Sequence, residues 1–517
     1  MRALIKFIGG VADNNLTGSS SLLQIQIGRK KLNVLIDIGL IQGRFHDSIE
    51  KNRSILNTIK PSDIDFIVLT HSHIDHIGRL PLLAKAGFSG RIICTIGTRG
   101  LLQVMLEDSA KIQMAEAGYL SKHLEKENYH TQKKTHGRQY LTRGKYDRAK
   151  RKKKEIKSPH YLPLYTIADV SLVDNLVKNG GYPYHQWIRL SHNVDLKFYP
   201  SGHVMGGAIV VIRINDKGEQ KVICFSGDLG RQDGIILPPP ERIKEPADCL
   251  VLESTYGGRR HPDRDEEITK LLDLVNRVGK FKRRLIIPSF TLERAQEIIY
   301  LLSYHMAKGD IPAVPIYLDS PLGNKITSVF ATGWESKMFS DQNRLNFNPF
   351  DPEQNSYLRV IISQEESDVL TSKSGGHIII AGSGMCDAGR VRGHLRANLS
   401  KTDTTVCLVG YMAENTLGRR LKEQHHSVNM NKEEIIVRAE IISFDSFSAH
   451  ADSIFLAQYA LSVIAKKPNT PKNIYLVHGG VLSATDLKND IEDILPATQK
   501  KITWVSVPKL NETVYVS

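Results

Sequence analysis

The chain has 517 residues, of which 41% are hydrophobic and 24% charged. This balance is ordinary for a globular protein, and the length exceeds a single compact core, so we expect two or three domains. The sequence contains no run of about 18 apolar residues, the length needed to span a bilayer. The N-terminus lacks the apolar region of a secretory signal. We therefore expect a soluble, cytoplasmic protein without a membrane partner, and the net charge of +14 favours a polyanionic partner such as nucleic acid.

The first predicted strands are short. Residues 4–8 and 22–27 are expected to form two strands around a turn, with a polar segment before the second. Residues 32–37 predict a third strand, which ends on Asp37. Because a buried carboxylate needs a partner, Asp37 is a candidate to orient a neighbouring ligand.

The run 64–69 predicts a buried strand, and Thr-His-Ser-His-Ile-Asp-His follows it at 70–76. This motif brings His71, His73, Asp75 and His76 together after the carboxyl end of a strand, where α/β proteins usually place their chemistry. Two imidazoles at i and i+2 can converge on one metal ion, while Asp75 and His76 hold a second. A His-rich surface loop is the alternative, but the buried strand favours a metal site.

The next region is expected to be a strand at 91–96 and then mainly helix to about residue 178. Within it, Lys133 to Lys157 contains twelve Lys or Arg residues and only two acidic ones. This basic stretch, which includes Lys152, is either a solvated insertion or a contact for a phosphate backbone.

Four later predicted strands each end on a residue that can bind metal or transfer protons. They end on His203, Asp228, Glu253 and His478. These residues are candidates to converge on the first motif. The five cysteines are scattered singly, mostly in apolar runs, as reduced core cysteines are, so the metal site must consist of histidines and carboxylates.

A second α/β unit is expected from about Gly258. Strands at 284–288, 314–318, 377–381 and 406–410 alternate with helices, which predicts a parallel sheet. The earlier pattern then returns, so this unit is inserted into the first. We expect a first domain at 1–257, the insertion at 258–446 and the rest of the first domain at 447–517.

These motifs, in this order, resemble the metallo-β-lactamase fold. The residues around Glu253, the segment 447–450 and the segment 476–479 resemble its β-CASP branch, the nucleases similar to the mRNA 3′-end-processing endonuclease and RNase J. Further matches lie at 287–290, 318–322, 382–385 and 416–420. The resemblance implies an α/β protein, a metallo-β-lactamase αββα sandwich with an inserted β-CASP α/β domain.

The resemblance also implies a zinc-dependent ribonuclease with two ions per chain and a hydroxide nucleophile that bridges them. The metal ligands would be His71, His73, His203, Asp228, Asp75, His76 and His478. His450 would protonate the leaving oxygen with Glu253 beside it, Asp75 and Asp228 would act in catalysis, and Asp37 would support the ligands. The substrate, RNA, would contact Ser383, Arg294 and Lys152.

Endonucleolytic and 5′-3′ exonucleolytic cleavage both stay open, as does a homodimer. A DNA-processing β-CASP nuclease is one alternative, although that branch usually carries Val where this chain has His478. A catalytically weak RNA-binding scaffold is another, but such a protein is expected to lose ligands, and all seven are present.

Overall fold

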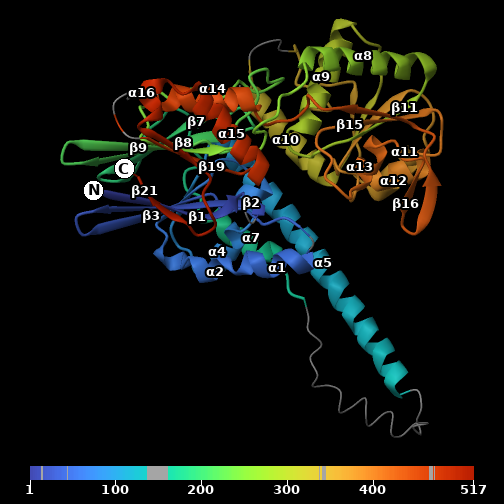
Figure 1. The fold of residues 1–517 in the computed structure, drawn as a ribbon. Coiled ribbons are helices and arrows are strands. Elements are labelled where there is room, and N and C mark those ends of the chain that lie inside the picture. The colour runs from blue at the N-terminus through green and yellow to red at the C-terminus, as the bar shows by residue number, and fades with distance from the viewer. Residues whose placement is uncertain are drawn as a thin grey trace.

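A computed structural model describes residues 1–12, 15–43, 45–136, 161–336, 338–340, 345–464, 470 and 472–516. The described residues form two bodies that lie side by side, and a long helix, α5 (Ile96–His136), extends away from the first body (Figure 1). Most of the basic stretch, including the predicted RNA contact Lys152, lies outside the described residues.

The first body contains two sheets. The first has the strand order β21-β1-β2-β3-β4-β5, and the second has the order β20-β19-β10-β9-β8-β7-β6. The strands of the first sheet are β1 (Arg2–Val11), β2 (Asn15–Ile27), β3 (Lys30–Ile36), β4 (Phe66–Val68), β5 (Arg91–Ile93) and β21 (Thr513–Tyr515). Those of the second are β6 (Ile188–Ser191), β7 (Val194–Pro200), β8 (Ala208–Asp216), β9 (Glu219–Phe225), β10 (Cys249–Glu253), β19 (Lys472–Val477) and β20 (Thr503–Ser506).

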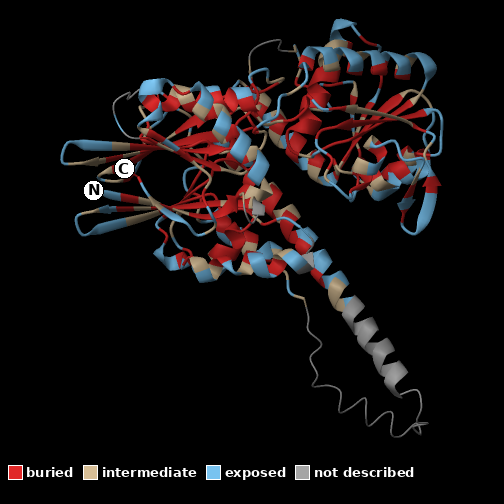
Figure 2. Ribbon diagram, viewed as in Figure 1, coloured by how far each residue is buried: buried red, intermediate tan, exposed pale blue. Residues whose placement is uncertain are grey.

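The two sheets pack face to face over one apolar core. Phe7 and Val34 of the first sheet share this core with Phe198, Val210 and Val251 of the second. Helices cover both outer faces, and the strands between them are largely buried (Figure 2). The helices on the first sheet are α4 (Leu80–Lys85), α5 and α7 (Ile167–Asp174), and those on the second are α14 (Ser453–Ile464) and α15 (Val481–Ile494). The first body is therefore the predicted αββα sandwich.

The second body is built on a third sheet, with the order β13-β12-β14-β11-β15-β18, in which every pair is parallel. Its strands are β11 (Arg284–Pro288), β12 (Ile316–Asp319), β13 (Leu358–Val360), β14 (His377–Ala381), β15 (Thr404–Val409) and β18 (Glu440–Phe444). Its helices are α8 (Arg264–Phe281), α9 (Arg294–Lys308), α10 (Pro321–Glu335), α11 (Gln364–Ser372), α12 (Val391–Asn398) and α13 (Leu417–Lys422). The predicted parallel sheet is present, and it lies between β10 and β19 in the chain.

Three local predictions differ from the structure. The polar segment 17–21 belongs to β2, because its backbone pairs with β1 through two irregularities in the register. A short helix that was not predicted, α3 (Ile74–Ile77), carries Asp75 and His76. The C-terminal β21 was not predicted, and it pairs antiparallel with β1, with Leu4 opposite Tyr515.

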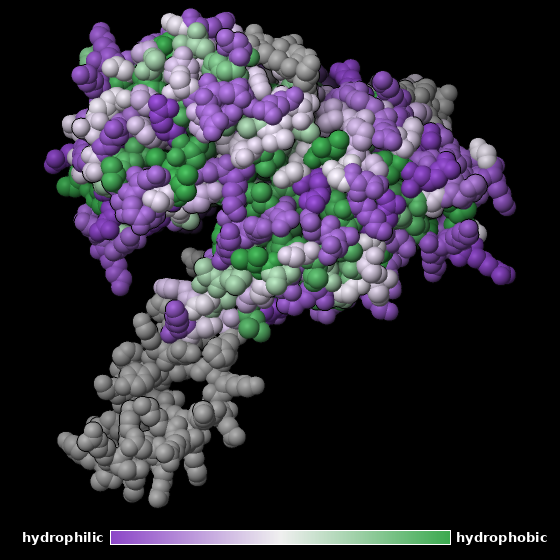
Figure 3. Space-filling view, turned by 180° about the vertical axis from the view of Figure 1, so that it is seen from behind, coloured by the Kyte–Doolittle hydropathy of each residue, from purple (hydrophilic) through white to green (hydrophobic). Residues whose placement is uncertain are grey.

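The surface seen from behind is mostly hydrophilic, with hydrophobic residues in patches (Figure 3). Among the described residues, no helix has the length and apolar character needed to cross a membrane. All five cysteines are buried and free, as predicted.

Candidate metal centre

The ends of three strands bring the first group of ligands together. His71 and His73 follow β4, His203 follows β7, and Asp228 follows β9. One potential ligand atom from each of the four lies within 4.8 Å of those of the others. His73 Nδ1 is 3.0 Å from His71 Nε2 and 3.2 Å from His203 Nε2, and Asp228 Oδ2 is 3.5 Å from each of those two Nε2 atoms.

A second group lies on the other side of the Asp228 carboxylate. Asp75 and His76 come from α3, and His478 follows β19. Asp228 Oδ1 is 3.3 Å from His76 Nε2 and 3.4 Å from His478 Nδ1, while Asp75 Oδ2 is 3.3 Å from His478 Nε2. Because its two oxygens face different groups, Asp228 lies where a bridging ligand would.

Two buried atoms of this centre have no hydrogen-bond partner. They are His76 Nε2 and Asp228 Oδ1, which belong to side chains that are 2% exposed. Buried polar atoms are normally hydrogen-bonded, since leaving one unsatisfied costs roughly 1–3 kcal/mol. A bound cation would satisfy both atoms, and five imidazoles with two carboxylates suit a borderline metal. The residues therefore fit a two-ion centre.

The electrostatics of the first group suit metal binding. Burial lowers the pKa of His71 and His203 well below the ordinary value and that of His73 to about 4. Burial would raise the pKa of Asp228, but His478, His76 and His71 hold it well below its usual range. Neutral imidazoles and an ionised carboxylate are the forms that bind metal.

Asp37, which the sequence suggested as a support for the ligands, contacts His76 of the second group. Its carboxylate accepts hydrogen bonds from the backbone N–H and the hydroxyl of Thr70, at 2.8 and 2.7 Å, and contacts His76 Nδ1 at 2.8 Å. Burial would lower the pKa of His76, but Asp228 and Asp37 raise it well above the ordinary value. A carboxylate on Nδ1 leaves Nε2 free to bind a metal, which is the usual support for a ligating histidine.

His450 and Glu253 form a pair beside the centre. His450 Nδ1 lies 3.1 and 3.2 Å from the two oxygens of Glu253, and its ring centroid is 4.5 Å from that of His203. Glu253 also accepts the backbone N–H groups of Leu229 and Thr255, at 2.7 and 3.2 Å. Burial would lower the pKa of His450, but Glu253 raises it to about 9.

Two family models match this chain. The model of the metallo-beta-lactamase superfamily matches residues 17–138, and that of the Beta-Casp domain matches residues 295–421. Ribonuclease TTHA0252 of Thermus thermophilus is 30% identical over 444 residues, which cover 85% of this chain and 87% of that protein. The chain belongs to the β-CASP branch of the metallo-β-lactamase superfamily.

Other relatives agree with this assignment. The RNase J-like protein of Methanocaldococcus jannaschii is 23% identical over 480 residues, which cover 92% of each chain. Cleavage and polyadenylation specificity factor subunit 3-I of Arabidopsis thaliana is 26% identical over 477 residues, which cover 91% of this chain and 59% of that protein. The predicted resemblance to this family is confirmed.

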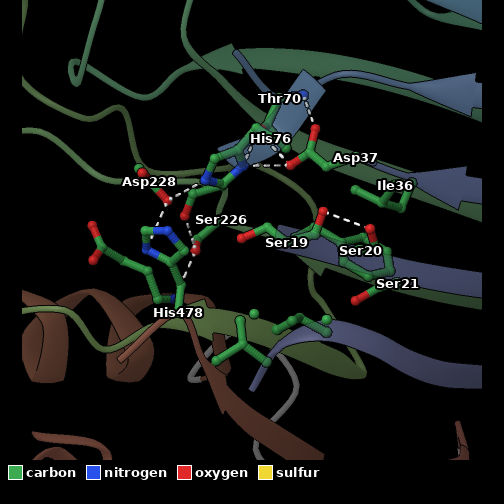
Figure 4. A pocket seen from close by; sticks show the side chains of 17 residues that line it. Ser19, Ser20, Ser21, Ile36, Asp37, Thr70, His76, Ser226, Asp228 and His478 are labelled. Atoms are coloured by element: carbon green, nitrogen blue, oxygen red, sulfur yellow. Dashed lines mark hydrogen bonds and ion pairs between the residues drawn. The ribbon is translucent and has the colours of Figure 1, made fainter. Parts of the chain in front are cut away.

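In this β-CASP protein a cavity of about 40 Å³ lies behind the metal centre, between the two sheets. It is lined by Ser19, Ser20 and Ser21 of β2, together with Asp37, His76, Asp228 and His478 of the centre (Figure 4). Apolar side chains, among them Phe225, Val251 and Val477, also line it. The segment 17–21, where the sequence suggested a turn, thus contributes three serines to the wall of this cavity.

The predicted substrate contacts of the β-CASP domain lie elsewhere. Ser383 is half-buried in the turn after β14. Arg294 is 5% exposed, contacts the Glu297 carboxylate, and lies over the Phe447 ring at 5.8 Å. The contact of Ser383 and Arg294 with RNA stays a prediction, and Arg294 already has partners within the protein.

Two further residues of the site, Thr70 and Thr255, were not predicted from the sequence. The Thr70 hydroxyl lies 3.0 Å from His71 Nδ1, and the Thr255 hydroxyl donates to the His478 carbonyl at 2.8 Å. Both threonines lie within two residues of a predicted site residue. That proximity was the available signal, but it does not show which partner each hydroxyl contacts.

Proposed function

We propose that this β-CASP protein is a zinc-dependent ribonuclease with two ions per chain. The observation that carries the proposal is the pair of ligand groups that share Asp228, with His450 and Glu253 beside them. His71, His73, His203 and Asp228 would hold one ion, and Asp75, His76, His478 and Asp228 the other. When bound, two ions would neutralise charge on the scissile phosphate and activate the attacking water.

His450 would protonate the leaving oxygen. The Glu253 carboxylate accepts a hydrogen bond from His450 Nδ1–H. His450 Nε2 is directed away from Glu253, so Nε2 would carry the proton that goes to the leaving oxygen. The backbone N–H groups of Leu229 and Thr255 fix Glu253 in turn. Asp37 would keep His76 oriented in each cycle.

RNA is the proposed substrate because a relative at 30% identity is named a ribonuclease. The net charge of +14 also suits a polyanion. DNA is the rival substrate, and a scaffold that binds RNA without cutting it is the rival function. A homodimer stays a prediction that light scattering would test.

The test is digestion of four substrates by the purified, zinc-loaded protein: 5′-labelled linear RNA, internally labelled RNA, circular RNA and DNA of the same sequence. We expect RNA cleavage that the Asp228→Ala variant lacks. Cutting of the circle would show the endonucleolytic mode, and release of labelled mononucleotide only from the 5′ end would show the exonucleolytic one. Cleavage of DNA alone, or binding of RNA without cleavage, would contradict the proposal.

A further inference from the structure

The segment that precedes His450 is held by the first turn of α8, the first helix of the second body. Glu267 of α8 accepts the backbone N–H of Ser446 at 2.6 Å and that of Asp445 at 3.2 Å. A carboxylate that accepts two backbone N–H groups fixes the path of that backbone strongly, since such bonds are charge-assisted. This contact fixes the backbone where the chain leaves β18 of the second body, five residues or fewer before His450.

Arg264 contacts the same segment from the same turn. Its Nη2 lies 3.4 Å from the carbonyl oxygens of both Ser446 and Ser448, and its Nη1 donates to the Asp233 carbonyl at 2.7 Å. The side chain is 5% exposed, and its closest carboxylate oxygen, Asp233 Oδ2, is 3.7 Å from Nε. That carboxylate already binds Arg231 through two hydrogen bonds, of 2.7 and 2.6 Å. Arg264 therefore directs most of its donors to backbone carbonyls.

These contacts continue to His450. The His450 backbone N–H lies 3.3 Å from Ser448 Oγ, and the next residue, Ala451, donates to the Leu229 carbonyl at 2.8 Å. The Leu229 N–H in turn donates to Glu253, the partner of the His450 ring. Two sets of contacts thus set the imidazole: α8 fixes the backbone on one side, and Leu229 fixes it on the other.

We propose that Arg264 and Glu267 are positioning residues for His450, through which the inserted β-CASP domain sets the geometry of proton donation. Neither residue touches a candidate metal ligand directly, although the segment they hold reaches one, since His203 Nδ1 lies 3.4 Å from the Ala449 carbonyl oxygen. Metal content is therefore measured together with the cleavage rate. The inference rests on the proposed role of His450. A displacement of a catalytic group by about 1 Å costs on the order of 10²-fold in rate.

The test is a double-mutant cycle of Arg264→Ala and His450→Ala, measured with ordinary RNA and with RNA that has a bridging sulfur in place of the departing oxygen. Sulfur leaves without full protonation, so this substrate bypasses the acid. We expect Arg264→Ala to slow cleavage of ordinary RNA by about 10- to 100-fold with unchanged KM and metal content. The sulfur substrate should lose less than about 3-fold. Added guanidinium should restore part of the rate.

The cycle separates positioning from a structural role. In the His450→Ala background, Arg264→Ala should add less than about 2-fold, because groups that act through one another are not additive. The proposal would be overturned if the effects of the two mutations multiplied in the double mutant. It would also be overturned if Arg264→Ala slowed cleavage of both substrates equally or lost metal. Arg277→Ala, on the exposed face of α8 where it pairs with Glu440, is the matched control and should match the parent.

Glu267→Ala supplies an independent variant, because Glu267 is only half-buried and its loss leaves Arg264 in place. Glu267→Ala should also slow cleavage of ordinary RNA more than that of the sulfur substrate, with a smaller effect than Arg264→Ala. If Arg264→Ala does not fold, this variant tests the positioning role by itself. Failure of the proposed function gives a different result. If the proposed function is wrong, the parent protein itself does not cleave RNA, and if only the role of His450 is wrong, His450→Ala cleaves ordinary RNA at the parent rate. Failure of the positioning role alone leaves His450→Ala slow and Arg264→Ala as fast as the parent.

Discussion

Each body of the molecule contains a buried aspartate near the carboxyl end of a strand, and the two differ in one respect. Asp319 in the second body accepts Ser367 Oγ at 2.6 Å, His394 Nε2 at 2.6 Å and Arg390 Nη1 at 2.7 Å. Asp228 in the first body has histidines around it, yet its Oδ1 has no hydrogen-bond partner. The side chains of both are at most 2% exposed.

The difference shows how a structural cluster is told from a metal centre. The positive charge that balances Asp319 is part of the chain, because Arg390 is always protonated. No Arg or Lys forms an ion pair with Asp228 among the described residues, so its balancing charge must come from protonated histidines or from bound cations. In this molecule the absence of an Arg or Lys partner at Asp228 distinguishes its cluster from the one around Asp319.

The largest expected effect is that of Asp228→Ala. Both ions should be lost together, and RNA cleavage should fall by at least about 10³-fold, since metal stabilisation of transition-state charge is worth several kcal/mol. Elemental analysis and a cleavage assay measure the two results. His478→Ala should weaken mainly one ion, and Asp319→Ala should keep both. If Asp319→Ala also lost its metal, the comparison between the two aspartates would fail.

His450→Ala should have the next largest effect. Because His450 is not in either ligand group, the variant should keep both ions and bind RNA normally, yet cleave about 10²–10⁴-fold more slowly. RNA with a bridging sulfur as the leaving atom should recover much of the rate. Loss of zinc, or no recovery with sulfur, would make His450 a ligand or a structural residue.

Asp319→Ala should lower the free energy of unfolding and leave the cleavage rate of the folded protein unchanged. Removing one partner from a buried, hydrogen-bonded ion pair costs about 3–5 kcal/mol of unfolding free energy, which denaturant titration of the whole chain would measure. Ser367, His394 and Arg390 lower the pKa of Asp319 against the effect of burial. The contribution is thus present above the unfolded pKa of about 4 and is lost as the pH falls below it. A variant as stable as the parent at pH 7 would refute this.

The smallest expected effect comes from the basic stretch. Replacing Lys150, Arg151, Lys152, Lys153 and Lys154 by Gln should flatten the slope of log affinity against log salt, by about 0.7 for each lost phosphate contact. The cleavage rate at saturating RNA should not change, because phosphate contacts position a strand and do not cleave it. An unchanged slope would identify the stretch as a solvated insertion.

The parallel sheet could be predicted from the alternation of apolar strands and helices, and the αββα sandwich from the family resemblance. The ligand set stays a prediction, and the structure brings its seven residues into two adjacent groups. Apolar runs that end on His203, Asp228 and His478 give both the strands and the positions of the ligands. The strand limits were less exact. The segment 17–21 looked like a turn because polar composition favours one, whereas pairing with β1 makes it a strand.

The sequence by itself determined which residues are proposed to carry the chemistry, since the spacing of H-x-H-x-D-H and the residues at the strand ends are local features. Only the tertiary structure decided how they share their partners. Asp228 lies between two groups, Asp37 supports His76, and α8 reaches the backbone before His450. The physical reason is that these contacts join residues that are far apart in the chain, some by nearly 180 positions. The packing of strand ends and helices sets the distances between them, and local sequence patterns do not contain that packing.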